Sequence, residues 1–162
     1  MRREQEILNL LNRISEEDLV ITSNGKIGRE LFEARKKRKE PNDDFIMAGS
    51  MGGAIGIGYG VALNTVKQVY VLTGDGALLM KLGSLATIGE KLDNLHIVVF
   101  NNESYDSTGG QPTDFNEVKW FVKQYCQVID VEKGAREDLG RPDITPKQIA
   151  KNFYGKVKRI YN

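Results

Sequence analysis

The sequence has very few of the residues that form disulfides and zinc sites. Its 162 residues include one cysteine, Cys126, and one histidine, His96. A single cysteine cannot form an internal disulfide, and one cysteine with one histidine cannot supply the ligands of a structural zinc site. We therefore expect a reducing, cytoplasmic setting. Cys126 is expected to be a small buried hydrophobe, and His96 a residue at the start of a strand.

The chain also lacks an excess of charge of either sign. It has 23 Lys and Arg residues against 22 Asp and Glu, so its net charge is +1. Such a balance creates no global field that would attract nucleic acid. The amino-terminal stretch "MRREQEILNLLNRI" places apolar residues at helical spacing between charges, which predicts an amphipathic helix and excludes a signal peptide or membrane span. Nucleic acid and membranes are therefore not expected partners.

What the chain does contain is an alternation of short apolar runs and helical patterns. Runs rich in Val and Ile predict strands at 19–22, 45–48, 69–73, 95–100 and 127–131. Helical patterns lie between them at 29–38, 52–64 and 78–92. This order predicts an α/β fold in which a doubly wound parallel sheet carries helices on both faces. At this length we expect a single domain over residues 1–162.

Polar residues stand where two of the predicted strands end. In "VLTGDGALLM" Asp75 lies between Gly74 and Gly76, and the strand at 95–100 is followed by Asn101 and Asn102. Parallel sheets bind ligands beyond the carboxyl ends of their strands. Free amide groups at Gly76 and Ala77 suit a phosphate, while carboxylate and amide oxygens suit Mg²⁺. The pattern predicts a diphosphate and magnesium site.

Two other phosphate-binding motifs do not fit the spacing. A Walker A loop needs a glycine five residues before a Gly-Lys pair, but Val20 and Ala150 occupy those positions before the only two such pairs. A dinucleotide fingerprint that began at Gly56 and Gly58 would need its last glycine where Val61 stands. Nucleoside triphosphates and dinucleotides are therefore not the expected ligands.

The spacing of the two polar motifs carries a family resemblance. Gly74-Asp75-Gly76, followed after 24 residues by Asn101-Asn102, resembles the signature of thiamine diphosphate (ThDP) enzymes. The resemblance implies ThDP and Mg²⁺ as cofactors, with Asp75, the side chain of Asn102 and the main-chain carbonyl of Ser104 as metal ligands. It also implies that the Gly49 carbonyl accepts a hydrogen bond from the aminopyrimidine and that Met51 bends the cofactor. The implied cofactor-binding set is Asn24, Gly49, Ser50, Met51, Gly74, Asp75, Gly76, Ala77, Asn102 and Ser104. Lys26 either reaches the diphosphate or is simply exposed.

Longer segments narrow the resemblance. "TSNGKIGRELFEAR", "DFIMAGSMGGA", "VYVLTGDGALLMKLGSLATIG", "NNESYDSTGGQPT" and "GAREDLGRPDITP" are similar to the carboxyl-terminal half of phosphonopyruvate decarboxylases, and also to the beta subunit of sulfopyruvate decarboxylase. The resemblance implies decarboxylation of a small 2-oxo acid that carries a phosphonate or a sulfonate. The segment "DLGRP" at 138–142 favours the phosphonate. Asp106, Ser107 and Gln111 are candidates for lining the substrate pocket, although a plain loop would also explain Asp and Ser there.

Two departures from the family keep a second interpretation open. Family members carry a pyrimidine-binding domain whose glutamate activates the cofactor, and this chain contains none, so we expect a partner subunit to supply it in a hetero-oligomer. The stretch from Asp114 to Cys126 is also shorter than its counterpart in the family. The chain is therefore either the cofactor-binding subunit of a split decarboxylase or a ThDP and Mg²⁺ binding module without catalytic activity.

Overall fold

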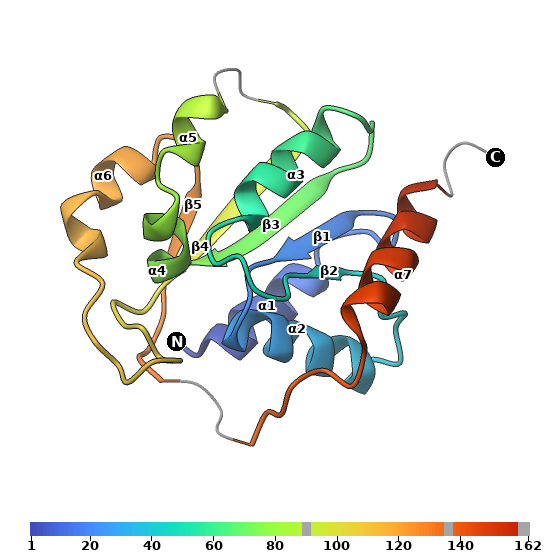
Figure 1. Cartoon of the computed structure of the whole chain (residues 1–162), viewed down its shortest axis with the longest axis horizontal. Helices are drawn as coiled ribbons and strands as arrows, with labels where there is room; N and C mark the ends of the chain where they lie inside the picture. Colours follow the sequence, from blue (N-terminus) through green and yellow to red (C-terminus); the bar gives the residue numbers. More distant parts are fainter. Residues whose placement is uncertain (89–91, 135–137, 159–162) are drawn as a thin grey trace.

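A five-stranded parallel sheet forms the centre of the molecule (Figure 1). The structure is a computed structural model that describes residues 1–88, 92–134 and 138–158. The strand order is β2-β1-β3-β4-β5, and every neighbouring pair is parallel. The strands are β1 (Leu19–Thr22), β2 (Phe45–Ile46), β3 (Val69–Gly74), β4 (Leu95–Asn101) and β5 (Gln127–Asp130). The predicted α/β fold with a parallel sheet is confirmed.

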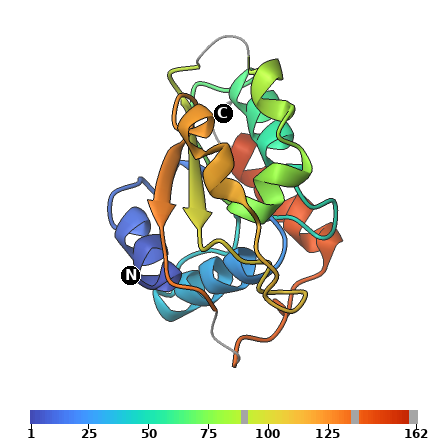
Figure 2. The same ribbon diagram turned by 90° about the vertical axis from the view of Figure 1, so that its left-hand side faces the viewer.

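Helices cover both faces of this sheet (Figure 2). One face carries α1 (Arg3–Leu11) and α2 (Lys26–Lys37). The other carries α3 (Ala54–Ala62), α4 (Asp75–Met80), α5 (Ser84–Thr87), the 3-10 turn η1 (Phe115–Glu117), α6 (Lys119–Val122) and α7 (Pro146–Lys158). A hydrophobic core lies on each face of the sheet, and successive residues of a strand belong to different cores because side chains alternate across a strand. Val71 packs against α3 on one face, and Leu72 lies in the core beneath α1 and α2 on the other.

Two features of the helices differ from the sequence-based prediction. The single helix expected at 78–92 is wrong, because α4 ends at Met80 and a turn at 81–83 separates it from α5; residues 89–91 lie outside the described part of the chain. Gly83 in that turn disfavours a continuous helix. Helix α7 was not predicted, although Thr145 and Gln148 form a reciprocal capping box at its start and Pro146 suits a first helical turn.

The two residues expected to have no catalytic role lie where the sequence placed them. Cys126 is buried, and this burial raises the pKa of its thiol to about 12, so it remains a protonated apolar side chain. His96 is the second residue of β4, stacks on Tyr70 and shares a 2.6 Å hydrogen bond with Gln68. Within the described ranges, no helix is both long and apolar enough to cross a membrane.

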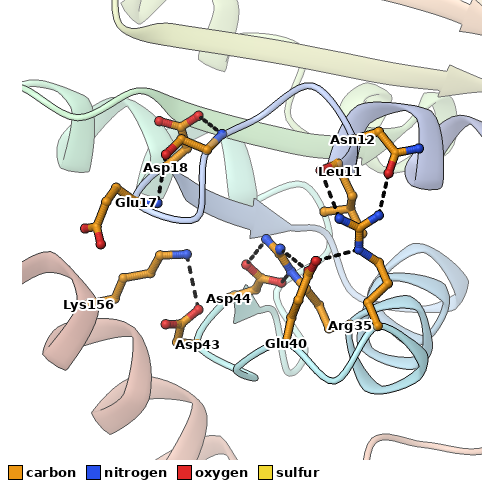
Figure 3. A network of polar contacts seen from close by, with 11 residues as sticks. Leu11, Asn12, Glu17, Asp18, Arg35, Glu40, Asp43, Asp44 and Lys156 are labelled. Carbon is orange, nitrogen blue, oxygen red and sulfur yellow. Dashed lines mark hydrogen bonds and ion pairs between the residues drawn. The ribbon is translucent and has the colours of Figure 1, made fainter.

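A network of buried charges fastens α7 to the rest of the fold (Figure 3). Arg35 of α2 donates hydrogen bonds of 2.9 and 3.1 Å to both oxygens of Asp44, and one of 2.7 Å to Glu40. Beside it, Lys156 of α7 lies 3.2 Å from Asp43. These contacts join α2, the segment before β2 and α7, and thereby fix the carboxyl-terminal helix next to the edge strand.

Candidate functional site

A cleft of about 700 Å³ opens at the carboxyl end of the sheet. The chain leaves β1 toward β2 on one side, and β3 pairs with the other side of β1, so the strand order reverses direction there. Open α/β sheets bind ligands at such a reversal. The loops after four strands line the cleft, joined by Arg3 of α1 and by the segment leading into α7; the lining includes residues 23–27, 46–49, 74–77, 104–108 and 141–142.

Asp75 is a buried carboxylate whose partners, among the described residues, are all neutral. The residue is 2 % exposed, and its Oδ2 accepts a 2.7 Å hydrogen bond from the hydroxyl of Thr113. Burial raises the pKa of Asp75, and hydrogen bonds from Thr113 and from the backbone amides of Gly76 and Glu103 oppose that rise. Among the described residues no Lys, Arg or His pairs with it. All its partners are therefore neutral, which leaves its negative charge available to a bound cation.

Sheet register brings the second polar motif beside the first. Gly74 pairs with Phe100 across β3 and β4, so the residues that follow both strands meet at one edge. The Asn102 side chain donates a 2.7 Å hydrogen bond from Nδ2 to Asp106. This bond assigns the NH₂ group to the Asp106 side and leaves Oδ1 as the amide atom that can bind a metal. Ser104, buried two residues later, also lines the cleft.

The chemistry of these residues would suit a magnesium ion. Asp75 offers a carboxylate oxygen, Asn102 an amide oxygen and Ser104 a main-chain carbonyl, and Mg²⁺ is held in proteins by a few such oxygens together with phosphate oxygens. The described ranges contain no group of three or more His, Cys, Asp or Glu residues that could hold an ion by themselves.

Most of the other predicted cofactor-binding residues also line the cleft. They are Asn24, Gly49, Met51, Gly74, Gly76 and Ala77. Gly49 has a φ of +90°, which glycine adopts at no steric cost. At Gly76, a Cβ would stand 2.4 Å from a ring carbon of Tyr105, so glycine is what lets that ring pack on the start of α4. Ser50 lies outside the lining, and its carbonyl accepts a hydrogen bond from Gly53.

Of the three candidates for substrate contact, two line the cleft and one does not. Asp106 and Ser107 line the cleft, together with Lys26, whereas Gln111 is exposed and lies outside the lining. Sequence reasoning missed Thr113, although it ends the quoted motif "GGQPT", and Tyr105, which Gly76 accommodates. It also missed Arg3, for which no local signal exists, because only the packing of α1 on α2 carries this side chain to the cleft.

Comparison with known proteins gives a consistent result. The family described as "Thiamine pyrophosphate enzyme, C-terminal TPP binding domain" matches residues 23–160. Phosphonopyruvate decarboxylase from Streptomyces viridochromogenes is 33 % identical over 89 % of this chain and 43 % of its own length. The beta subunit of sulfopyruvate decarboxylase from Methanothermobacter thermautotrophicus is 40 % identical over 78 % of this chain and 60 % of its own.

A solved structure supports the fold independently. A protein from Mycobacterium smegmatis, assigned to the thiamin diphosphate-dependent enzymes, superimposes with a TM-score of 0.54 at 18 % identity, over 85 % of this chain and 32 % of that one. The present chain thus spans less than two thirds of these relatives.

Proposed function

The chain belongs to the thiamine pyrophosphate enzymes, as their C-terminal TPP binding domain, and from that premise we propose that it is the diphosphate- and Mg²⁺-binding part of a cytoplasmic ThDP-dependent 2-oxo acid decarboxylase. The observation that carries this proposal is the buried carboxylate of Asp75 in the cleft, whose partners in the described part of the chain are neutral donors. A divalent cation held there with a diphosphate would supply the positive charge that these donors lack.

Each residue of the proposed site has a distinct task. Asp75 would hold the metal by charge, and Asn102 and Ser104 would complete its coordination by neutral oxygens. Met51 lines the cleft with 37 % of its surface exposed, so it is free to pack against the ring system of the cofactor. When bound, ThDP supplies an electron sink that makes loss of CO₂ from a 2-oxo acid feasible.

The cations of the cleft support a substrate with a second anionic group. Lys26, Arg29 and Arg141 line it, and within the described ranges none of them forms an ion pair. Phosphonopyruvate and sulfopyruvate both carry a strong anion besides the 2-oxo acid carboxylate, and relatives named for each acid match the chain. Phosphonopyruvate is the proposed substrate because the "DLGRP" segment that includes Arg141 resembles that group. Sulfopyruvate is the alternative.

We further propose that another subunit completes the site. Three relatives in the sulfopyruvate group are named as a beta subunit, and a fourth is named sulfopyruvate decarboxylase without a subunit. In this chain, Met51 and Met80 are exposed at the cleft, where a second protein that covers the cofactor would bury them. That subunit would bring a pyrimidine-binding domain with its activating glutamate.

The proposal is tested by reconstitution. The chain is co-purified with the product of a neighbouring reading frame that encodes a pyrimidine-binding domain, and CO₂ release from phosphonopyruvate, sulfopyruvate and pyruvate is measured with ThDP and Mg²⁺. Decarboxylation of phosphonopyruvate is expected to be the fastest, and Arg141→Met is expected to raise KM for it more than for pyruvate. ThDP binding without turnover of any of the three acids would instead favour the non-catalytic module. Preference for pyruvate would contradict the proposed substrate class.

A further inference from the structure

We propose that Arg3 is a positioning residue for the metal ligand Asn102, and that it acts through the carboxylate of Asp106. This inference rests on the magnesium site of the proposed function. It concerns a chain of contacts that runs from the first helix, through a loop residue, to one coordinating atom. None of its members besides Asn102 is a proposed ligand.

Arg3 is fixed by a buried ion pair between α1 and α2. Its Nε and Nη2 donate hydrogen bonds of 2.7 and 2.9 Å to the two carboxylate oxygens of Glu30, and the two residues are 7 % and 3 % exposed. The planar guanidinium then has its remaining amino group, Nη1, free to face a second acid. That group lies 3.7 Å from Oδ2 of Asp106, within ion-pair distance. A lysine has a single nitrogen and could not hold both acids in this geometry.

Asp106 is held on both of its oxygens. Oδ2 accepts the 2.7 Å bond from Nδ2 of Asn102 and faces Arg3, while Oδ1 accepts a 3.3 Å bond from the backbone amide of Gly134. A carboxylate with three partners, only 12 % exposed at its side chain, has little freedom to rotate. Its engagement with Asn102 and Arg3 favours a positioning role over direct contact with substrate.

The consequence for Asn102 is a defined amide orientation. A side-chain amide can bind a cation only through its oxygen, and a half-turn about its last torsion would present the NH₂ group instead. The carboxylate of Asp106 accepts from NH₂ and would repel an oxygen, so it selects the orientation in which Oδ1 remains for the metal. Arg3 in turn holds Asp106 in place and balances its charge in a partly desolvated site. Such outer contacts change metal affinity by about 10- to 100-fold.

The test compares metal affinity with thermal stability in the same variants. Mn²⁺ is added to the full chain with ThDP, and paramagnetic broadening of the Gly76 amide proton is followed to obtain an apparent Kd. Asp106→Ala is expected to weaken binding about 10- to 100-fold. The pair Arg3→Met with Glu30→Leu replaces the ion pair by apolar side chains, so neither Arg3 nor Glu30 is left as an unpaired buried charge, and Asp106 loses its cation. It is expected to weaken binding by roughly tenfold at a similar Tm. Combining this pair with Asp106→Ala is expected to weaken metal binding no further than Asp106→Ala alone.

The control is a matched ion pair far from the metal ligands. Arg35→Met with Asp44→Leu removes the buried pair of Figure 3 in the same manner, and its apparent Kd is expected to equal that of the wild type. Unchanged affinity in both Asp106→Ala and the Arg3 and Glu30 pair, with binding intact in the wild type, would overturn this inference alone. So would additive losses in the combined variant. Failure of the wild type to show any broadening at Gly76 would overturn the magnesium site and this inference together.

Discussion

Asp44 and Asp75 are both buried carboxylates, 5 % and 2 % exposed, yet their surroundings differ in kind. Asp44 receives two hydrogen bonds from the guanidinium of Arg35 (Figure 3). Burial lowers the pKa of Arg35, but its bonds to Asp44 and Glu40 raise it overall, so Arg35 stays charged. Burial raises the pKa of Asp44, and the hydrogen bonds and charge of Arg35 oppose that rise. Within the described ranges, Asp75 accepts hydrogen bonds from a hydroxyl and from backbone amides, and from no charged side chain.

The difference separates a structural charge from a binding charge. At Asp44 the chain supplies the counter-ion itself, and the product is a fixed junction between α2 and the segment before β2. At Asp75 it supplies neutral donors that hold the carboxylate in place without cancelling its charge. Burial raises the pKa of both acids, so what marks Asp75 as a functional candidate is its place in the cleft without a cationic partner among the described residues. Removal of the charge should therefore reduce stability at Asp44 and reduce cofactor binding at Asp75.

The largest effect on stability is expected at Asp44. Asp44→Ala leaves the buried Arg35 with Glu40 as its remaining partner among the described residues, and breaking a buried pair in this way costs about 3 to 5 kcal/mol. Urea unfolding followed by circular dichroism measures the loss. A loss below about 1 kcal/mol would show that this pair is not the structural element described here.

Asp75→Asn is expected to act on binding and not on folding. The amide is isosteric and carries no charge, so the free energy of unfolding should stay the same or rise, because an unneutralised buried charge is removed. Binding of ThDP with Mg²⁺, measured by calorimetry, should be lost. An Asp75→Asn variant that is less stable but still binds the cofactor would contradict this account, because Asp75 would then serve stability and not binding.

Thr113→Val tests whether neutral donors hold Asp75. Removing the hydroxyl should raise the pKa of Asp75 further and destabilise its ionised form by about 1 to 3 kcal/mol. As the pH falls, Asp75 would then take up its proton at a higher pH than in the wild type, which an NMR titration of the carboxyl carbon measures. Thr113→Ser keeps the hydroxyl and serves as the control. A pKa that does not move in Thr113→Val would remove this residue from the site.

The smallest effect is expected at Glu40, on the rim of the structural network. Burial raises its pKa, but hydrogen bonds from Arg35 and Arg38 lower the pKa overall. A lowered folded-state pKa means that Glu40 stabilises the protein above its unfolded pKa and loses this contribution as the pH falls through the folded value. Glu40→Gln should therefore cost less than about 1 kcal/mol at neutral pH and flatten the acid limb of the stability curve. A steeper acid limb in Glu40→Gln would contradict the lowered pKa of Glu40.

The local sequence pattern was sufficient to predict the parallel sheet and the meeting of Asp75 and Asn102 at one edge of it. The strands β1, β3 and β4 are continuous apolar runs, and Asp75 and Asn102 follow two of them directly, so parallel pairing alone brings them together. The contacts of Thr113 and Arg3 depend on how a loop and a helix return to the sheet, which no local pattern encodes. The apolar helical pattern also failed to predict the end of α4, because a short turn around Gly83 separates this helix from α5.

The most direct test of the account is the position of a metal ion in crystals of the chain soaked with ThDP and Mn²⁺. An anomalous difference peak is expected at bonding distance, about 2.1 to 2.2 Å, from a carboxylate oxygen of Asp75, Oδ1 of Asn102 and the carbonyl oxygen of Ser104, next to the diphosphate. Bound cofactor with the peak elsewhere, or with no peak at these three atoms, would contradict it.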